Sequence, residues 1–458
     1  MVCGNITVMQ NILNKEQNEI LKILNLPTTR AEIKSYYIEN CKKGILKTGL
    51  EYERISLDSR TFETAKYNVL SEIIKNFALI NEWELIFDSD IVIGAKDGFN
   101  SISLEPGGQF EISLEPKYSL DDILENLTHY TRQIDRLGEY YNVSFFNIGI
   151  NPKETYIDID IVKKRRYEIM ADYLPKLGKL APVMMRETAG VQANFDYTSE
   201  EDAILKLKTA AYMSPFITGF YANSPIRDNA VSGYKSFRAL AWKYTGIDRC
   251  GLFYKNLINS RMGQGFEDYI DTILNVPMLY IIRNKQIIEL NGSITFKDFM
   301  QKGYGEYSAS LNDYILHSSL TFPDIRLKNC LEVRNHDSQN TLNALSVCAL
   351  YKGILYSKDA INEVMEFLKP LNYDDLENYG MQSAKFGVDY MADKLKMTAS
   401  DAARKLFEIS RRYLPDNEKD YLDTPIWLLK NRKCMADLIL EKGIKDSESL
   451  CRHVKNNR

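Results

Sequence analysis

The 458-residue sequence has few histidines and no cysteines at metal-binding or redox-motif spacing. It contains four His and seven Cys, and no two cysteines form a CxxC pair. This argues against a mechanism built on several histidines, a structural zinc site and a secreted disulfide framework. Glycine and proline are also sparse, at 24 and 13 residues, whereas 29 Tyr and 19 Phe are available to fill a core. The composition therefore predicts a folded globular protein with free thiols, and it excludes a disordered chain.

The chain also lacks a long apolar run and a strong excess of either charge. No stretch of about 18 apolar residues occurs, and the first twenty residues lack the basic start and the uninterrupted apolar segment of a signal peptide. The 58 Lys and Arg residues nearly balance the 62 Asp and Glu residues, and the basic side chains are scattered. We therefore predict a cytoplasmic protein, a monomer or a homodimer, that binds neither nucleic acid nor a membrane.

The hydrophobic pattern divides the chain into three parts. Residues 8–47 have apolar residues at helical spacing, with a second helix expected after Thr28 and Thr29. From Gly49 to about Asp337, strand-like stretches alternate with helical runs, and beyond Gln339 nearly all of the pattern is helical. Expected strands are 49–57, 83–93, 101–113, 142–150, 184–197, 278–288 and 326–334. This order predicts an α+β fold, with a catalytic domain at 1–340 and a helical C-terminal extension at 341–458 packed on it.

Several expected strands carry carboxylates and amides on one face. Residues two apart on a strand point to the same side of a sheet. A sheet with one solvent-exposed face would produce the same alternation. We favour a functional face because these positions contain hardly any Lys and because a Pro-Gly-Gly break allows close approach of a ligand. The residues concerned are Glu51 and Glu53; Glu105, Gln109 and Glu111; Gln192 and Asn194; and Glu332 and Arg334.

Five glutamates on converging strands would require cations to neutralise them. Oxygen ligands with no Cys and little His suit Mg²⁺, with Mn²⁺ as a second choice, rather than zinc. Several such ions imply a polyphosphate substrate, because Mg²⁺ is usually shared between carboxylates and phosphate oxygens. Arg334 would then stabilise a phosphoryl group during transfer. The sequence has no GxxxxGK[ST] motif and no GxGxxG after a strand, so metal and carboxylates would hold a nucleotide in place of a P-loop.

The sequence resembles glutamate-cysteine ligases of the plant and proteobacterial type in eight ordered blocks. These are GLEYER (49–54), LEPGGQFE (104–111), RYEIM (166–170), MMRETAGVQANFDYTSE (184–200), YANSP (221–225), GYKSFRALAW (233–242), VPM (276–278) and FPDIRLKNCLEVR (322–334). The resemblance covers residues 49–340 and continues more weakly through ARKLFEISRRYL (403–414). It implies a glutamine-synthetase-like fold, in which a curved antiparallel sheet flanked by helices forms a funnel with Mg-ATP at one end and the amino acids at the other.

The resemblance also implies a reaction and a set of site residues. ATP would phosphorylate the γ-carboxylate of L-glutamate, and the amine of an acceptor, cysteine in the family, would displace phosphate to leave a γ-glutamyl amide. Glu51, Glu53, Glu105, Glu111, Glu332 and Gln192 look like metal ligands, and Gln109, Asn194 and Arg334 look like nucleotide contacts. Arg334, Asn194 and Arg238 are the implied catalytic residues, and the implied amino-acid site contains Arg238, Trp242, Arg249, Tyr167 and Asn223.

The chain departs from the family pattern close to the implied amino-acid pocket. Ala189 stands where the family usually has Cys, Tyr244 and Gly246 replace two acids, and Tyr52 replaces a His. The implied metal and phosphate residues are all present, so ATP-dependent ligation is better supported than cysteine as the acceptor. Another amine in a specialised pathway is the main alternative. Two further alternatives are an ATP-independent γ-glutamyl transferase and a non-catalytic sensor of nucleotide or amino acid.

Overall fold

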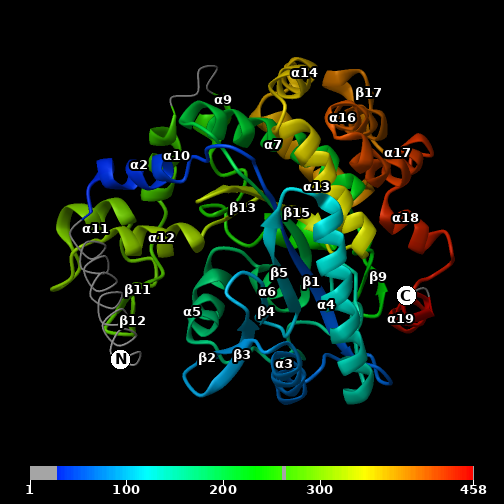
Figure 1. Cartoon of the computed structure of the whole chain (residues 1–458), viewed down its shortest axis with the longest axis horizontal. Coiled ribbons are helices and arrows are strands. Elements are labelled where there is room, and N and C mark those ends of the chain that lie inside the picture. Colours follow the sequence, from blue (N-terminus) through cyan, green and yellow to red (C-terminus); the bar gives the residue numbers. More distant parts are fainter. Residues whose placement is uncertain (1–27, 260–264, 457–458) are drawn as a thin grey trace, which may run out of the picture.

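The molecule is built on one sheet of nine strands, in which all neighbouring strands are antiparallel. The computed structural model describes residues 28–259 and 265–456 (Figure 1). The strand order is β14-β15-β7-β1-β5-β4-β3-β2, and β6 pairs with β1. The bounds are β1 Thr48–Asp58, β2 Glu84–Asp88, β3 Ile91–Lys96, β4 Ser101–Leu104, β5 Phe110–Lys117, β6 Val143–Phe146, β7 Gly190–Phe195, β14 Ile325–Leu327 and β15 Leu331–Asp337. The predicted α+β class with a large antiparallel sheet is confirmed.

Four long helices cover the apolar face of this sheet. They are α3 (Tyr67–Asn81), α4 (Leu120–Tyr141), α7 (Glu200–Phe220) and α13 (Thr341–Leu355). Helix α13 packs on β1 and β7, α4 packs on β5 and β6, and α7 packs on β14 and β15 (Figure 1). Leu50 and Tyr52 of β1 are fully buried beneath them. Burial of this face turns the alternate residues Glu51 and Glu53 to the opposite side.

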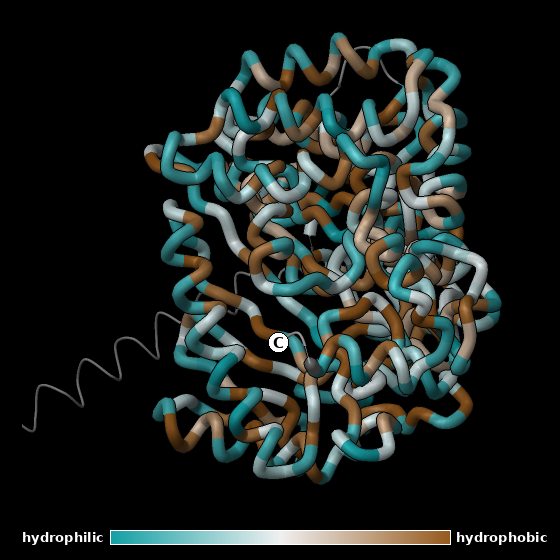
Figure 2. The backbone as a smooth tube through the Cα atoms, turned by 90° about the vertical axis from the view of Figure 1, so that its right-hand side faces the viewer, coloured by the Kyte–Doolittle hydropathy of each residue, from teal (hydrophilic) through white to brown (hydrophobic). Residues whose placement is uncertain are grey.

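The C-terminal part is helical, as predicted. It contains α14 (Lys358–Leu368), α15 (Tyr373–Phe386), α16 (Ala399–Tyr413), α17 (Asp423–Lys430), α18 (Met435–Leu440) and α19 (Ser447–Asn456). Helix α16 packs on α13 and α7, and α15 packs on α7. Hydrophilic and hydrophobic residues alternate along the outer helices (Figure 2), as expected where one helix face meets a core. One hydrophobic cluster runs from Ile33 to Ala436, and the division at residue 340 stays a prediction.

Shorter elements connect the sheet to its surroundings. They are α2 (Arg30–Glu39), α5 (Arg165–Tyr173), α6 (Ala181–Glu187), α8 (Phe237–Lys243), α9 (Lys255–Asn259), α10 (Phe266–Leu274), α11 (Phe296–Lys302), α12 (Leu311–Ser319), and the short strands β8 Ile226–Arg227, β9 Ala230–Val231, β10 Cys250–Gly251, β11 Tyr280–Arg283, β12 Gln286–Glu289, β13 Phe322–Pro323, β16 Met391–Ala392 and β17 Met397–Thr398. No helix in the described ranges is long and apolar enough to span a bilayer.

Several expected strands differ from the structure. The ranges 83–93, 101–113 and 326–334 each contain parts of two antiparallel strands instead of one strand: β2 and β3, β4 and β5, and β14 and β15. Residues 184–187 are helical instead of extended, because Pro182 opens α6 at a position where proline suits the first helical turn. Residues 278–288 form a hairpin instead of one strand, with Asn284 and Lys285 at positive φ in its two-residue turn. The second helix expected within 8–47 is α2, whose start is capped by Thr29 and Glu32, and the first falls mainly outside the described residues.

Candidate active site

The sheet register brings the predicted carboxylates together on one face. Glu53 pairs with Glu111 across β1 and β5, and Glu51 pairs with Gln192 across β1 and β7. On the next strand pair, Asn194 lies opposite Glu332. Paired residues in an antiparallel sheet point to the same side. The four central strands therefore present one continuous row of acids and amides.

A cavity opens over this row, and we call it the carboxylate cavity. Glu105 reaches it from the Pro-Gly-Gly turn between β4 and β5, and Tyr167 reaches it from α5. Arg334 of β15 closes one side. The polar residues that line this cavity are Glu51, Glu53, Glu105, Gln109, Glu111, Arg166, Tyr167, Thr188, Gln192, Ser319, Arg326 and Arg334.

Burial and neighbouring carboxylates disfavour the ionised forms of Glu53 and Glu111. Burial and the neighbouring Glu105 carboxylate raise the pKa of Glu53 to about 7. Burial, followed by the charges of Glu105, Glu51 and Glu53, raises the pKa of Glu111 well above its usual value. Such shifts mean that the ionised carboxylates lack enough positive charge nearby. A cation bound in the cavity would supply it.

The donor atoms fit magnesium shared with a phosphate better than a closed metal site. Among the described residues, no group of three or more His, Cys, Asp or Glu side chains is already arranged to hold a metal ion. Mg²⁺ commonly takes one or two carboxylates and completes its shell with water and substrate phosphate oxygens. Pairs such as Glu53 and Glu111, side by side across two strands, meet that requirement.

Amide side chains hold two of the carboxylates in place. Glu53 accepts hydrogen bonds from the Gly190 N–H at 2.5 Å and from Gln192 Nε2 at 2.9 Å. Glu51 accepts one from Asn194 Nδ2 at 2.9 Å. Gln192 also accepts a hydrogen bond from Arg334. Asn194 does not line the cavity and acts on it through Glu51.

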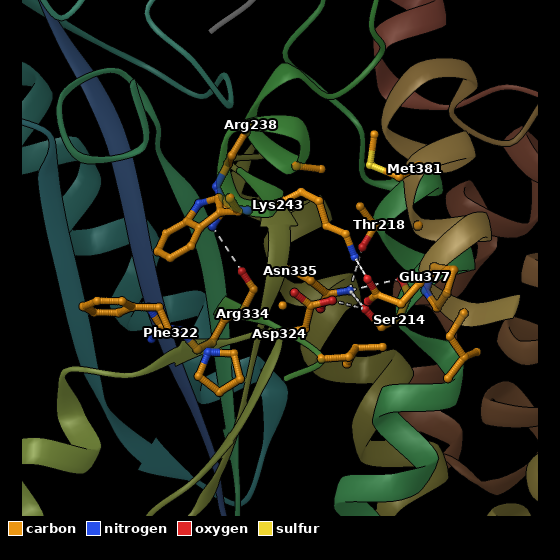
Figure 3. Close-up of a pocket in the computed structure, with 18 residues that line it drawn as sticks. Ser214, Thr218, Arg238, Lys243, Phe322, Asp324, Arg334, Asn335, Glu377 and Met381 are labelled. Carbon is orange, nitrogen blue, oxygen red and sulfur yellow. Dashed lines mark hydrogen bonds and ion pairs between the residues drawn. The ribbon is translucent and has the colours of Figure 1, made fainter. Parts of the chain in front are cut away.

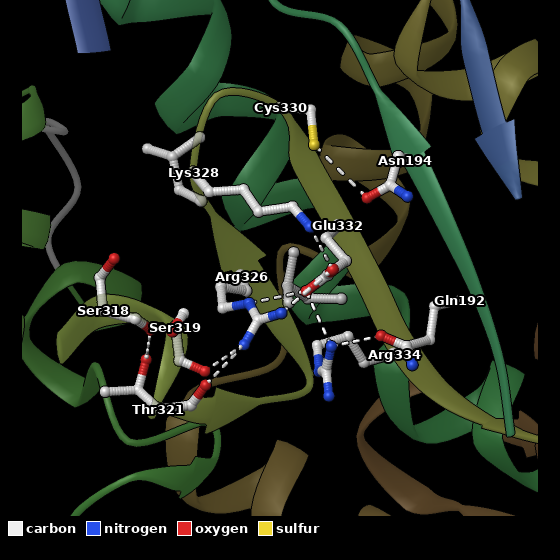
Figure 4. A network of polar contacts seen from close by, with 12 residues as sticks. Gln192, Asn194, Ser318, Ser319, Thr321, Arg326, Lys328, Cys330, Glu332 and Arg334 are labelled. Carbon is white, nitrogen blue, oxygen red and sulfur yellow. Dashed lines mark hydrogen bonds and ion pairs between the residues drawn. The ribbon is translucent and has the colours of Figure 1, made fainter. Parts of the chain in front are cut away.

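Glu332 lies at the centre of three cationic side chains (Figure 4). Its oxygens lie 2.7 Å from Arg326 Nε, 2.6 Å from Lys328 Nζ and 2.9 Å from Arg334 Nη1. Although Glu332 is fully buried, these cations hold the pKa of its carboxyl well below the usual range. Each Glu332 oxygen already has a cationic partner, and nothing in the structure tests whether it also binds a metal. The predicted role of Glu332 as a metal ligand therefore stays a prediction.

Arg326 and Lys328 were not among the predicted site residues. Arg326 lines the carboxylate cavity and pairs with Glu332 across the β14–β15 register. Lys328 lies 3.8 Å from Glu51, so it links that carboxylate to Glu332. The signal was present in the sequence, since both basic residues fall within the FPDIRLK block.

A second cavity shares Trp242, Phe322 and Arg334 with the first (Figure 3). Arg238 and Trp242 are four residues apart on α8 and therefore on one helix face. Their side chains stack, with the guanidinium carbon 5.5 Å from the indole centroid, a cation–π distance. Arg238 Nε and Trp242 Nε1 are buried and have no hydrogen-bond partner among the residues described.

Two predicted amino-acid residues do not reach either cavity. Arg249 is fully buried, where its Nη2 donates to the Asp248 carboxylate at 2.8 Å and to the Pro277 carbonyl at 3.0 Å. Asn223 donates to the carbonyls of Asn147 and Ser338 at 2.9 Å. These contacts tie both side chains to the core, although Arg249 Nη1 has no partner among the described residues. Their place in the substrate site stays a prediction.

Gln109 and Tyr167 both line the carboxylate cavity, and their predicted roles stay predictions. Gln109 accepts from the Gly107 N–H at 2.8 Å and donates to the Thr188 carbonyl at 2.8 Å, which fixes the Pro-Gly-Gly turn. Tyr167 donates to Glu105 Oε1 at 3.3 Å. Gln109 therefore supports the cavity wall instead of presenting a free amide, and Tyr167 sits beside the acids and away from the second cavity.

Gly107 is expected to tolerate no side chain. A Cβ atom there would lie 2.1 Å from the carbonyl oxygen of Arg186, so Gly107→Ala must move the turn that carries Glu105. We expect the free energy of unfolding to fall by about 1–3 kcal/mol, as for other overpacked sites. Thermal melts would measure this, with Gly380→Ala as control because a Cβ there has no neighbour within 4 Å. Equal melting temperatures for the two variants would contradict the packing argument.

Comparison with known proteins identifies the family. The model of the glutamate-cysteine ligase family 2 matches residues 47–453. Glutamate–cysteine ligase B, chloroplastic, from Oryza sativa subsp. japonica is 35% identical over 356 residues, 77% of this chain and 71% of the relative. The chloroplastic glutamate–cysteine ligase from Nicotiana tabacum is 34% identical over 77% of this chain and 67% of its own length.

A solved structure agrees with the fold. The crystal structure of a glutamate–cysteine ligase from Francisella tularensis in complex with AMP superposes with a TM-score of 0.57, covering 91% of this chain and 89% of that chain. At 12% identity this match supports the glutamine-synthetase-like fold alone.

The plant relatives also overturn one expectation. Their names describe chloroplastic enzymes, so the prediction of a cytoplasmic protein is wrong. The family assignment itself is unaffected, because it depends on sequence similarity along most of the chain. The chain belongs to glutamate-cysteine ligase family 2, and it is an enzyme of the ATP-dependent carboxylate–amine ligase class.

Proposed function

We propose that the protein joins L-glutamate to L-cysteine with ATP, through γ-glutamyl phosphate, to form γ-glutamylcysteine. The observation that carries this proposal is the convergence of four repelling glutamates and Arg334 on one cavity in a chain of this ligase family. Acids that repel one another at neutral pH are suited to divalent cations, and divalent cations are suited to a polyphosphate.

The metal-binding part of the proposal concerns Glu51, Glu53, Glu105 and Glu111, with Gln192 and Glu332 as further candidates. Bound Mg²⁺ or Mn²⁺ would neutralise charge on the phosphates of ATP. The chain's own contribution is to hold these oxygens on a rigid sheet. Hydrogen bonds from Gly190 and Gln192 to Glu53 support this role, because oriented ligands bind a cation without further ordering.

Arg334 is proposed to stabilise the phosphoryl group in transfer. Its side chain lines both cavities and is held by Glu332 and Gln192. In the first step a γ-carboxylate oxygen of glutamate attacks the terminal phosphorus of ATP, and ADP leaves. In the second step the acceptor nitrogen attacks the acyl carbon, phosphate leaves and the nitrogen loses a proton. A guanidinium between the cavities can contact the phosphoryl oxygens in both steps.

Arg238 is proposed to bind the α-carboxylate of glutamate. We expect Arg238→Ala to raise the KM for glutamate by about 10- to 100-fold, because a charge-assisted pair is lost, and to leave the KM for ATP nearly unchanged. Initial rates of ADP release against each substrate would measure this. Arg238→Lys is the control, since it keeps the charge and loses the planar fork. An unchanged glutamate dependence in Arg238→Ala would refute the assignment.

The identity of the acceptor has a specific alternative, an amine other than cysteine. Tyr244 and Gly246 replace acids of the family pattern, and Tyr244 is 43% exposed on the turn after α8. A panel of amines with glutamate and Mg-ATP, read as ADP release and product mass, tests this point. Cysteine should give the highest kcat/KM. A higher kcat/KM for another amine would identify that amine as the acceptor in place of cysteine. A γ-glutamyl product formed without ATP would support the ATP-independent transferase.

A further inference from the structure

The second cavity contains an acid that no step above uses. Asp324 follows β13 and is partly exposed to this cavity. Its carboxylate accepts a hydrogen bond from Ser214 Oγ at 2.7 Å, and no cationic nitrogen of the described residues comes within the 4.0 Å of an ion pair. Burial raises the pKa of Asp324 above its usual value. An ionised acid in a cavity is unfavourable unless a cation pairs with it, so Asp324 can accept a cationic group of a ligand.

The other charges of this cavity are already balanced, with one exception. Glu377 is paired with Lys243, and Arg334 is paired with Glu332. Arg238, which is only 3% exposed, donates to the Arg334 carbonyl at 3.1 Å and forms no ion pair with any described acid. Asp324 and Arg238 are therefore the two charged residues of the cavity lining without an ion-pair partner among the described residues, and they have opposite signs. Asp337 and Glu53, which do not line this cavity, act on the Arg238 charge only from beyond ion-pair distance.

Polar atoms without a hydrogen-bond partner also differ between the two sides of the cavity, with donors near Arg238 and an acceptor near Asp324. On the Arg238 side, Arg238 Nε and Trp242 Nε1 are donors without an acceptor. On the Asp324 side, Asn335 is 7% exposed and its Oδ1 has no donor in the described part of the chain. Asn335 Nδ2 donates to Ser214 Oγ at 3.0 Å, the hydroxyl that donates to Asp324. The cavity thus offers donors on one side and acceptors on the other (Figure 3).

We infer that Asp324 and Asn335 Oδ1 bind the α-ammonium of glutamate while Arg238 and Trp242 bind its α-carboxylate. This rests on the proposed function and deepens it by assigning the ammonium subsite. A zwitterionic head group satisfies both unpaired charges at once. The γ-carboxylate, two methylene groups away, then extends toward Arg334, which lines both cavities. Asp324 is the residue that selects an α-amino acid over a plain dicarboxylate.

The test compares glutamate with glutarate, which lacks only the α-ammonium. We expect the wild-type enzyme to prefer glutamate in kcat/KM by at least about 100-fold, because an acid enclosed by a bound ligand rejects a ligand that leaves it unpaired. Asp324→Asn should reduce this preference by about tenfold or more, through the KM for glutamate, with the KM for ATP unchanged. Glu377→Gln is the matched control: it removes an acid of the same cavity that Lys243 already balances, and it should keep the preference.

An equal loss for glutamate and glutarate in Asp324→Asn, or an unchanged preference, would overturn the inference. Asp324→Glu, which keeps the charge one methylene further out, should retain more of the preference than Asp324→Asn, and the reverse order would count against the subsite even if one variant folds poorly. If the wild-type enzyme releases no ADP with glutamate, the proposed function fails. Calorimetric binding of glutamate and glutarate to the same variants then decides the subsite independently.

Discussion

Arg334→Ala is expected to lower kcat for ADP release by roughly 10³-fold, the scale found when an arginine that stabilises a transferring phosphoryl group is removed. Arg334 lines both cavities, so its guanidinium can contact a phosphoryl group that passes from a nucleotide in the carboxylate cavity to glutamate in the second cavity. Folding should survive the change, because the buried Glu332 keeps ion pairs with Arg326 and Lys328.

Arg334→Lys separates charge from geometry. Lysine keeps a cation near Glu332 but loses the planar fork, so we expect kcat between those of the wild type and the alanine variant. Thermal melts and kcat should be measured on the same preparations. Near wild-type ADP release in a folded Arg334→Ala protein would remove this residue from the phosphoryl-transfer step.

Glu53→Gln is expected to abolish magnesium-dependent turnover, with a loss of about 100-fold or more, and yet to stabilise the cation-free protein. Glu53 is partly buried beside Glu105, and its pKa is raised from 4.5 to about 7. The folded state therefore binds this proton more tightly than the unfolded state. As pH rises from 4.5 through 7, the wild-type protein loses up to roughly 3 kcal/mol that the glutamine variant retains.

Melting temperatures in a chelator at pH 5 and pH 8 measure this second effect. The variant should gain over the wild type at pH 8 and differ little at pH 5. Glu115→Gln is the matched control, since Glu115 lies on β5 outside the cavity and is paired with Lys117. A Glu53→Gln variant that is less stable than the wild type at pH 8 would show that Glu53 is not repelled by its neighbours.

The carboxylate cavity was predictable because the alternation of side chains between the two faces of a strand depends only on the local sequence. Glu51 and Glu53 alternate with buried Leu50 and Tyr52, and this pattern fixes which face they occupy before any partner strand is known. The pairing of Glu53 with Glu111 needed only that the two strands be neighbours. The family resemblance supplied that neighbourhood.

The second cavity was harder to foresee because distant segments build it. Ser214 of α7, Asp324 beside β13 and Asn335 of β15 meet through hydrogen bonds that span more than a hundred residues. Arg249 and Asn223 lie outside both cavities, because each donates to backbone carbonyls in the core, and their place in the substrate site stays a prediction. No spacing rule distinguishes such a residue from one that faces a ligand.

The most direct test of the γ-glutamyl phosphate route is an isotope-transfer experiment with ¹⁸O. Glutamate labelled with ¹⁸O in its γ-carboxylate should be incubated with cysteine, Mg-ATP and the enzyme, and the phosphate released should be weighed by mass spectrometry. If a γ-carboxylate oxygen attacks the terminal phosphorus, each inorganic phosphate will carry one labelled oxygen for each amide formed. Unlabelled phosphate accompanying a γ-glutamyl amide would contradict the acyl-phosphate route and, with it, the role assigned to Arg334.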